Sequence, residues 1–144
     1  MIKKKKQNID AIILSAGQGK RMRYKTKYKA KPLIKIQGNT LLEINLKSLS
    51  VSGIKNCVIN TSYKSHTIYK FIKSFSYKNK YPKIITSYEK HRLETGGGIK
   101  NALPYFNNNS FFSTSFRTDK IRWTIKTFTI IKISIFTTFT ICRI

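Results

Sequence analysis

A short apolar run that ends in a glycine-rich turn constrains this chain more than any other sequence feature. Residues 9–15 are mostly apolar with a β-branched bias, and residues 16–19 (Ala-Gly-Gln-Gly) follow directly. The pattern predicts a buried strand and then a turn whose backbone can approach a ligand closely. Successive N–H groups of such a turn can bind phosphate oxygens, and Lys20 and Arg21 add positive charge there.

Strand-like and helix-like patterns alternate between residues 9 and 106. Further strands are expected at 56–60 and 83–87, with a short extended piece and turn at 35–39. Thr40 and Glu43 form a capping box that opens a helix with apolar positions 42, 46 and 49 on one face, and Gly53 ends it. A second helix is expected from Ser65, with positions 68, 71, 72 and 75 facing inward, and a short third one at 99–103.

This alternation predicts an α/β, Rossmann-like fold with a mainly parallel sheet. Ligands of such sheets bind at the carboxyl ends of the strands, so the turn at 16–19 is the expected site. The turn is not a P-loop, because Arg21 follows Lys20 where Ser or Thr is required, and it is not a dinucleotide fingerprint, because Met22 replaces the third glycine. Taken alone, it could be a plain strand-to-helix turn.

Two later segments strengthen the phosphate-binding interpretation. Pro32 fixes the backbone and is expected to keep Lys31 out of helical geometry, at the rim of the glycine turn. Residues 94–98 (Glu-Thr-Gly-Gly-Gly) expose bare backbone against which a ring or a phosphate could lie, and they precede the expected helix at 99–103. Each segment alone could also be an ordinary turn.

The formal net charge of +24 suggests a polyanionic partner, and a basic, non-specific nucleic-acid-binding protein is the alternative function. The basic residues are spread along the chain, and Lys, Asn, Ile, Tyr and Phe are all abundant, so compositional drift is the favoured explanation of the charge. No zinc-finger, RRM or helix-turn-helix pattern is present. Cys57 lies in an apolar run and is expected to be a small buried hydrophobe. No stretch is long and apolar enough for a membrane span, so a cytoplasmic location is the expectation.

In order and spacing, residues 11–22, 31–33, 58–61, 87–89 and 93–99 resemble the sugar-1-phosphate nucleotidyltransferase family, in the branch of N-acetylmuramate-1-phosphate uridylyltransferase and mannose-1-phosphate guanylyltransferase. The resemblance implies a fold of the nucleotide-diphospho-sugar transferase type and a cytoplasmic transferase of EC 2.7.7 type that makes NDP-sugars for the cell envelope. UTP or GTP and a sugar 1-phosphate would be its partners, and Mg²⁺ its cofactor.

The resemblance also implies roles for single residues. Arg21 and Lys31 would be catalytic: Lys20 and Arg21 would hold the β- and γ-phosphates, and Lys31 the α-phosphate and the sugar phosphate. Gly96 and Gly97 would lie along the base. The residues implied to bind the nucleotide are Leu14, Ala16, Gly17, Gly19, Lys20, Arg21, Thr95, Gly96 and Gly97.

The chain departs from the family pattern after the third expected helix. The family carries a Mg²⁺-binding aspartate on the next strand, whereas residues 113–116 here read Ser-Thr-Ser-Phe, so no metal ligand is assigned. The composition changes abruptly near Phe112, and residues 113–144 contain no Gly, Pro or Asn. We expect residues 1–112 to be the N-terminal part of a nucleotidyltransferase domain, incomplete at its C-terminal side. Residues 113–144 are expected to be a disordered or irregular tail outside the family, produced by a frameshift. A truncated, inactive or non-functional fragment is therefore a further alternative.

Overall fold

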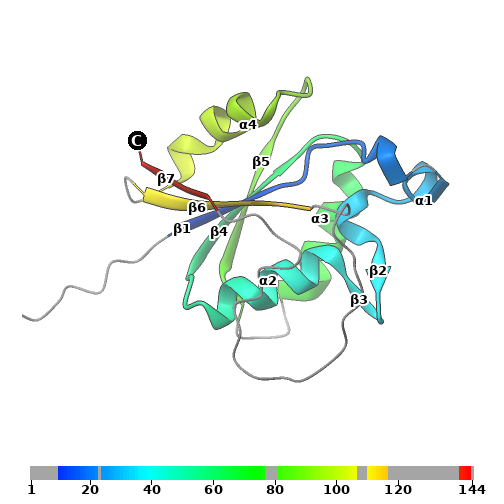
Figure 1. The fold of residues 1–144 in the computed structure, drawn as a ribbon, viewed down its shortest axis with the longest axis horizontal. Helices are drawn as coiled ribbons and strands as arrows, with labels where there is room; N and C mark the ends of the chain where they lie inside the picture. Colours follow the sequence, from blue (N-terminus) through cyan, green and yellow to red (C-terminus); the bar gives the residue numbers. More distant parts are fainter. Residues whose placement is uncertain (1–9, 23, 77–80, 107–109, 117–139, 144) are drawn as a thin grey trace, which may run out of the picture.

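The computed structural model describes residues 10–22, 24–76, 81–106, 110–116 and 140–143. Its central sheet has the strand order β5-β4-β1-β6-β7, and β2 and β3 form a separate two-stranded hairpin (Figure 1). β5, β4, β1 and β6 run parallel to one another, and β7 runs antiparallel to β6 at the end of the sheet. The predicted mainly parallel α/β sheet is thereby confirmed. The strands are β1 (Asp10–Leu14), β2 (Lys35–Ile36), β3 (Asn39–Thr40), β4 (Asn56–Thr61), β5 (Lys83–Tyr88), β6 (Ser110–Ser115) and β7 (Thr140–Arg143).

The register of the parallel strands brings three chain segments to one edge of the sheet. Leu14, at the carboxyl end of β1, pairs with Asn60 of β4 on one side and with Ser115 of β6 on the other. The segments that follow these three strands therefore start side by side, which is where parallel sheets place their ligands.

Helices cover both faces of this sheet (Figure 1). α2 and α3 pack on one face and α4 packs on the other. None of the described helices is long and apolar enough to cross a membrane. The α-helices are α1 (Tyr24–Tyr28), α2 (Leu41–Val51), α3 (Ser65–Ser76) and α4 (Thr95–Ala102), and the 3-10 turns are η1 (Lys20–Met22), η2 (Lys31–Leu33) and η3 (Leu103–Tyr105).

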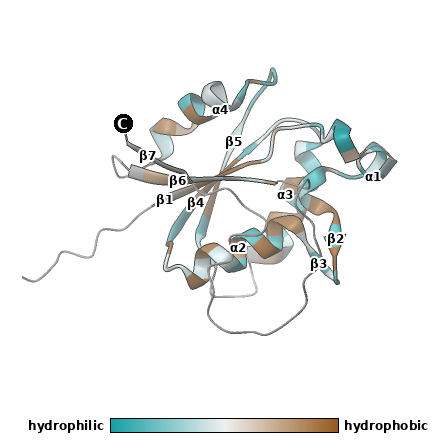
Figure 2. Cartoon of the chain, viewed as in Figure 1, coloured by the Kyte–Doolittle hydropathy of each residue, from teal (hydrophilic) through white to brown (hydrophobic). Residues whose placement is uncertain are grey.

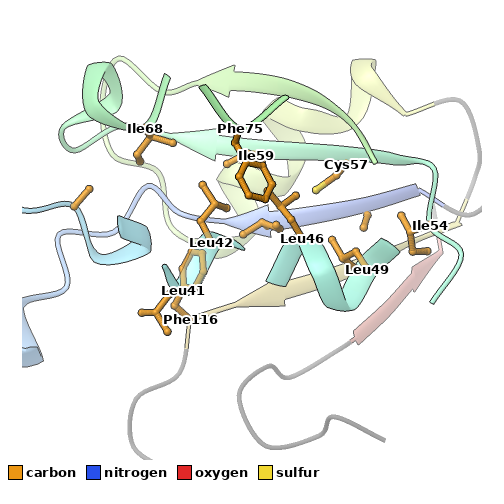
Figure 3. Close-up of a cluster of buried hydrophobic side chains, with 13 residues drawn as sticks. Leu41, Leu42, Leu46, Leu49, Ile54, Cys57, Ile59, Ile68, Phe75 and Phe116 are labelled. Carbon is orange, nitrogen blue, oxygen red and sulfur yellow. The ribbon is translucent and has the colours of Figure 1, made fainter. Parts of the chain in front are cut away.

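Alternate residues of the strands supply the two halves of the core. Ala11 and Ile13 of β1 face α2 and α3, whereas Ile12 faces α4. Figure 3 shows Leu42 and Leu46 of α2 directed toward the sheet in the larger cluster. Hydrophobic and hydrophilic residues alternate along α2, as expected for a helix that packs one face against a sheet (Figure 2).

Cys57 of β4 belongs to the larger cluster and has no exposed surface. Burial raises the pKa of its thiol well above the ordinary value, because the thiolate would have to lose its hydration. The prediction of a small buried hydrophobe is confirmed.

The local signals around α2 act as predicted. The Thr40 side chain accepts a hydrogen bond from the Glu43 amide at 3.1 Å, and Lys47 pairs with the Glu43 carboxylate at 3.0 Å. Gly53 follows the helix with a φ of +77°, a left-handed conformation that glycine adopts without strain. The Thr40 N-cap and the terminating glycine are therefore confirmed, whereas the Glu43 carboxylate of the predicted capping box pairs with Lys47.

Two local predictions need correction. α4 begins at Thr95 and not at Ile99, so the three glycines form its first turns, because packing against the sheet outweighs their poor helix propensity. Lys31 was expected to avoid helical geometry, yet it opens the 3-10 turn η2 with Pro32 in the next position. Proline disfavours the α-conformation of the residue before it, but it suits the first positions of a short turn.

β6 crosses the boundary predicted at residue 112. Its backbone pairs with β1 up to Ser115, and Phe116 is buried in the larger core cluster. Alternating Ser and Thr residues are compatible with a parallel strand, because the backbone supplies the pairing. Residues 140–143 form β7, so these segments are regular where an irregular tail was expected. Residues 117–139 lie outside the described part, and the division at residue 112 stays a prediction.

Candidate functional site

A cleft of about 520 Å³ opens at the carboxyl ends of β1, β4 and β6. The segment after β1, together with η1 and the start of η2, forms one side of the cleft. The segment that leads into α4 forms another side, and the end of β6 also lines the cleft. The lining residues are Leu14, Ser15, Ala16, Gly17, Gln18, Gly19, Lys20, Arg21, Lys31, Pro32, Asn60, Arg92, Leu93, Glu94, Thr95, Ser115 and Phe116.

Gly19 shapes the first wall. Its φ of +68° lies in the left-handed region, and a Cβ on it would stand 2.8 Å from Thr26 Cγ2 and 3.1 Å from Lys31 Cβ. Its carbonyl oxygen accepts hydrogen bonds from the Met22 amide at 2.9 Å and from the Thr26 hydroxyl at 3.1 Å. The glycine turn is thus packed directly against η2, the element that carries Lys31.

Positive charge dominates the cleft. Lys20 and Arg21 project from η1 and are exposed, whereas Lys31 is half-buried and donates a hydrogen bond to the backbone carbonyl of Phe116. With Arg92 there are four basic side chains, and Glu94 is the one carboxylate among the lining residues. Such an excess of cations suits a ligand with several phosphate groups.

The start of α4 forms the second wall. Glu94 occupies the N-cap position but makes no capping hydrogen bond through its side chain, which pairs with Arg92 at 3.3 Å instead. The first bond within the helix runs from the Gly98 amide to the Glu94 carbonyl, so the amides of residues 95–97 precede the ladder. Thr95 lines the cleft, whereas Gly96 and Gly97 do not.

Most of the residues predicted for the site come together in this cleft. Leu14, Ala16, Gly17, Gly19, Lys20, Arg21, Lys31 and Thr95 all line it. Gly96 and Gly97 are the next two residues of α4 and are not among the lining residues. Their predicted contact with a base stays a prediction.

A buried polar network beneath the cleft was not predicted. The Ser15 amide donates to Asn60 Oδ1 at 2.6 Å, Asn60 Nδ2 donates to Glu89 Oε1 at 2.7 Å, and the Leu93 amide donates to Glu89 Oε2 at 3.0 Å. Ser15, Asn60 and Glu89 are all buried. The available signal was a polar residue directly after the apolar part of each strand, since carboxyl ends of parallel strands meet at one edge.

The described cleft residues do not provide a Mg²⁺ site. Mg²⁺ prefers several oxygen ligands in octahedral geometry, whereas Glu94 is the one lining carboxylate and is paired with Arg92. Ser115 and Phe116 stand at the end of β6, where the family pattern calls for an aspartate. Within the described ranges, no three His, Cys, Asp or Glu side chains cluster around a common point. No catalytic step is therefore assigned to a metal.

Known proteins match this chain over the part that builds the cleft. The nucleotidyl transferase family model matches residues 10–121. N-acetylmuramate alpha-1-phosphate uridylyltransferase of Caulobacter vibrioides is 33% identical over 103 residues, which are 71% of this chain and 43% of that protein. D-glycero-alpha-D-manno-heptose 1-phosphate guanylyltransferase of Campylobacter jejuni is 34% identical over 105 residues, which are 72% of this chain and 45% of that protein.

Solved structures share the fold. HddC from Yersinia pseudotuberculosis, in complex with GMP-PN, superimposes with a TM-score of 0.66 at 28% identity, over 74% of this chain and 47% of that one. A UDP-glucose pyrophosphorylase in complex with UDP-glucose gives a TM-score of 0.65 at 16% identity, which supports the fold alone. This chain spans less than half the length of these relatives. By the family match and by these relatives, the chain belongs to the nucleotidyl transferase family.

Proposed function

We propose that this chain binds an NTP in the cleft and transfers NMP to a sugar 1-phosphate with release of pyrophosphate, which is NDP-sugar synthesis. The observation that carries the proposal is the meeting of the glycine turn, Lys31 and the start of α4 around one strongly basic cleft. Membership in the family and the names of the relatives, which include uridylyl- and guanylyltransferases of sugar 1-phosphates, support the same reaction.

The proposed reaction is a displacement at phosphorus. An oxygen of the sugar 1-phosphate attacks the α-phosphorus, and the bond from that phosphorus to the oxygen bridging to the β-phosphate breaks. Pyrophosphate leaves with the electron pair of that bond. The protein contributes orientation of the two reactants and neutralisation of the charge that moves onto the leaving group.

The basic residues have separate places in this scheme. Lys20 and Arg21 bind the β- and γ-phosphates, and Arg21 can grip two oxygens at once through its planar guanidinium group. Lys31 binds the α-phosphate. An ammonium group carries three donors, so Lys31 can hold the Phe116 carbonyl and a phosphate oxygen together. Thr95, Gly96 and Gly97 are proposed to face the nucleoside.

UTP or GTP is the proposed nucleotide, because a uridylyltransferase and two guanylyltransferases of sugar 1-phosphates are among the relatives. Cytidylyl- and adenylyltransferases of glucose 1-phosphate are also among them, so CTP and ATP are the comparison nucleotides. Mg²⁺ is expected from the family, and its ligands would have to come from outside the cleft residues described above. We therefore propose weak or absent turnover for this chain, since metal placement contributes several kcal/mol to stabilising such transition states. The proposed site of action is the cytoplasm.

Two measurements test the proposal. Calorimetric titration of the purified chain with UTP and with GTP should show binding of at least one of them. Radiolabelled pyrophosphate exchange, with N-acetylmuramate 1-phosphate or mannose 1-phosphate present, should be weak or undetectable. If neither UTP nor GTP binds, the proposed nucleotide site is contradicted. Fast pyrophosphate exchange would contradict the proposed impaired turnover.

We also propose that translation leaves the family's reading frame in the C-terminal part of the chain. The abrupt change of composition near Phe112 and the missing aspartate support this proposal. β6 extends to residue 115 and the family match to residue 121, so both continue past the change of composition at residue 112. The nucleotide sequence after codon 112 tests it: another frame should encode an Asp-containing strand and the remainder of the domain.

Non-specific polyanion binding is the second candidate function. α1 lies next to the cleft loop and presents Tyr24 and Tyr28, which are 75% and 77% exposed, with Lys25 and Lys27 near their rings. Exposed aromatic and basic side chains together suit single-stranded nucleic acids. This candidate predicts binding to a single-stranded oligonucleotide that weakens steeply with salt and shows no sequence preference.

A further inference from the structure

We propose that Asn60 and Glu89 are positioning residues that hold the two walls of the cleft at a fixed separation through one directional chain of hydrogen bonds. The inference rests on the proposed nucleotide site and adds to it two residues that act through others. Glu89 is not among the residues that line the cleft. Its influence on a bound nucleotide would pass through Asn60 and through the backbone of Leu93.

The chain of hydrogen bonds spans from one wall to the other. It starts at the amide of Ser15, in the segment after β1, and it ends at the amide of Leu93, in the segment before α4. Asn60, from the carboxyl end of β4, and Glu89, directly after β5, form the middle. Both walls are therefore tied to the rigid sheet by the same two side chains.

The two ends fix the chemistry of the middle. Both ends are backbone N–H groups, which can only donate. The side chain at position 60 must therefore accept from Ser15, and the side chain at position 89 must accept from Leu93. The remaining contact, between positions 60 and 89, needs one donor and one acceptor. An amide at 60 and a carboxylate at 89 satisfy all three bonds.

Burial makes this complementarity matter. Asn60 is 4% exposed and Glu89 is 2% exposed, so water cannot replace a lost partner readily. The network is also tightly enclosed, because a Cβ on Gly98 of α4 would stand 2.6 Å from Asn60 Nδ2 and 2.7 Å from Glu89 Oε1. The Glu89 amide donates to the Thr61 carbonyl at 2.8 Å, which fixes its backbone to β4.

Exchanging the amide and the carboxylate gives a sharp test. In Asn60→Asp, two carboxylates face each other. In Glu89→Gln, the new amide has one oxygen for two donors, Asn60 Nδ2 and the Leu93 amide. Its NH2 group must therefore face one of these donors, whichever way the amide is turned. The double variant N60D/E89Q restores every bond, because Asp at 60 accepts from Ser15 and from the amide nitrogen at 89, whose oxygen accepts from Leu93. Its formal charge equals that of the native protein.

Asn45→Asp is the matched control. Asn45 of α2 is also a buried asparagine, 3% exposed, and its amide donates to the Leu41 carbonyl at 2.9 Å and accepts from Thr114. It does not line the cleft. The same chemical change there should lower the melting temperature but leave nucleotide affinity within about twofold for the folded protein.

The readouts are the Kd for UTP and GTP by calorimetry, well below each melting temperature, and hydrogen exchange of the Ser15 and Leu93 amides. Each single variant should weaken binding about tenfold or more and speed exchange at both amides. The double variant should return both readouts to within about threefold of the native values. A double variant no better than its singles overturns the proposal, as do singles that bind like the native protein.

The two proposals fail in different ways. If the native chain binds neither UTP nor GTP, the proposed function is lost, and the exchange rates alone decide the network. If it binds a nucleotide and the swap does not rescue, the network proposal is lost and the nucleotide site stands. If the rescue restores amide protection but not affinity, Asn60 and Glu89 stabilise the loops without positioning the nucleotide, which also overturns the proposal.

Discussion

Gly98 lies so close to Glu89 that a Cβ on the glycine would stand 2.7 Å from the carboxylate oxygen Oε1. The third glycine of the triplet is therefore a packing residue beneath the cleft. Gly96, two positions earlier on α4, has nothing within 4 Å of its Cβ position and is exposed. Close packing therefore requires glycine at position 98 but not at position 96.

Alanine substitutions at the two positions should therefore differ in their effect on stability. Gly98→Ala should lower the free energy of unfolding by about 1–3 kcal/mol, because the added methyl group displaces Asn60 or Glu89 from a filled space. Gly96→Ala should leave it unchanged or raise it by up to about 1 kcal/mol, because alanine favours the helix. Urea unfolding followed by circular dichroism measures both. Equal effects of the two substitutions would contradict the packing role.

A similar pair exists in the glycine turn. Gly19→Ala should cost about 1–2 kcal/mol for the left-handed backbone alone, and more for the contact with Thr26 Cγ2 at 2.8 Å. Gly17→Ala is the control for stability, since nothing lies within 4 Å of its Cβ position, and it should stay within about 0.5 kcal/mol of the native protein. Thermal and urea unfolding check both values, and a Gly19→Ala protein of native stability would refute the argument.

The sequence predicts the sheet well because its signals are local. The apolar runs at 9–15, 56–60 and 83–87 became β1, β4 and β5, and the Thr40 cap and Gly53 fixed the ends of α2. The start of α4 could not be predicted from propensity, since three glycines disfavour a helix that only packing against Ile12 and Val58 stabilises. The place of residues 113–115 in the sheet is likewise set by pairing with β1, a partner a hundred residues away.

The sequence predicts only those parts of the site that belong to a recognisable motif. The spacing of glycines and lysines predicts the side of the cleft that the glycine turn and Lys31 form. Asn60 and Glu89 are single polar residues in ordinary strand contexts, and their contact depends on the lateral order β5-β4-β1. That order is a tertiary property, so no local pattern could reveal that the two side chains share a hydrogen bond.

Lys31→Met should weaken nucleotide binding in the cleft. The substitution keeps an unbranched side chain that is one atom shorter, but it removes the charge that is proposed to bind the α-phosphate. Hydrogen bonds to charged groups contribute about 1.5–3 kcal/mol. The Kd for UTP or GTP should therefore rise about 10- to 100-fold in calorimetric titrations at low salt. Lys29→Met is the control, because Lys29 is exposed and does not line the cleft. Equal losses in both variants would mean that only the overall charge matters.

The raised pKa of Cys57 should make the native protein less stable in alkaline solution. The folded-state pKa lies above the unfolded value, so the unfolded thiol releases its proton first as the pH rises, while the folded thiol keeps it. The contribution is fully present below the ordinary cysteine pKa of about 8.5 and declines by up to about 1.4 kcal/mol per pH unit above it. Urea unfolding of the native protein and of Cys57→Ala at pH 7 and pH 10 isolates this term, because all other groups are shared. The advantage of the native protein over the variant should shrink between the two pH values, and an unchanged difference would show that the thiol titrates normally in the fold.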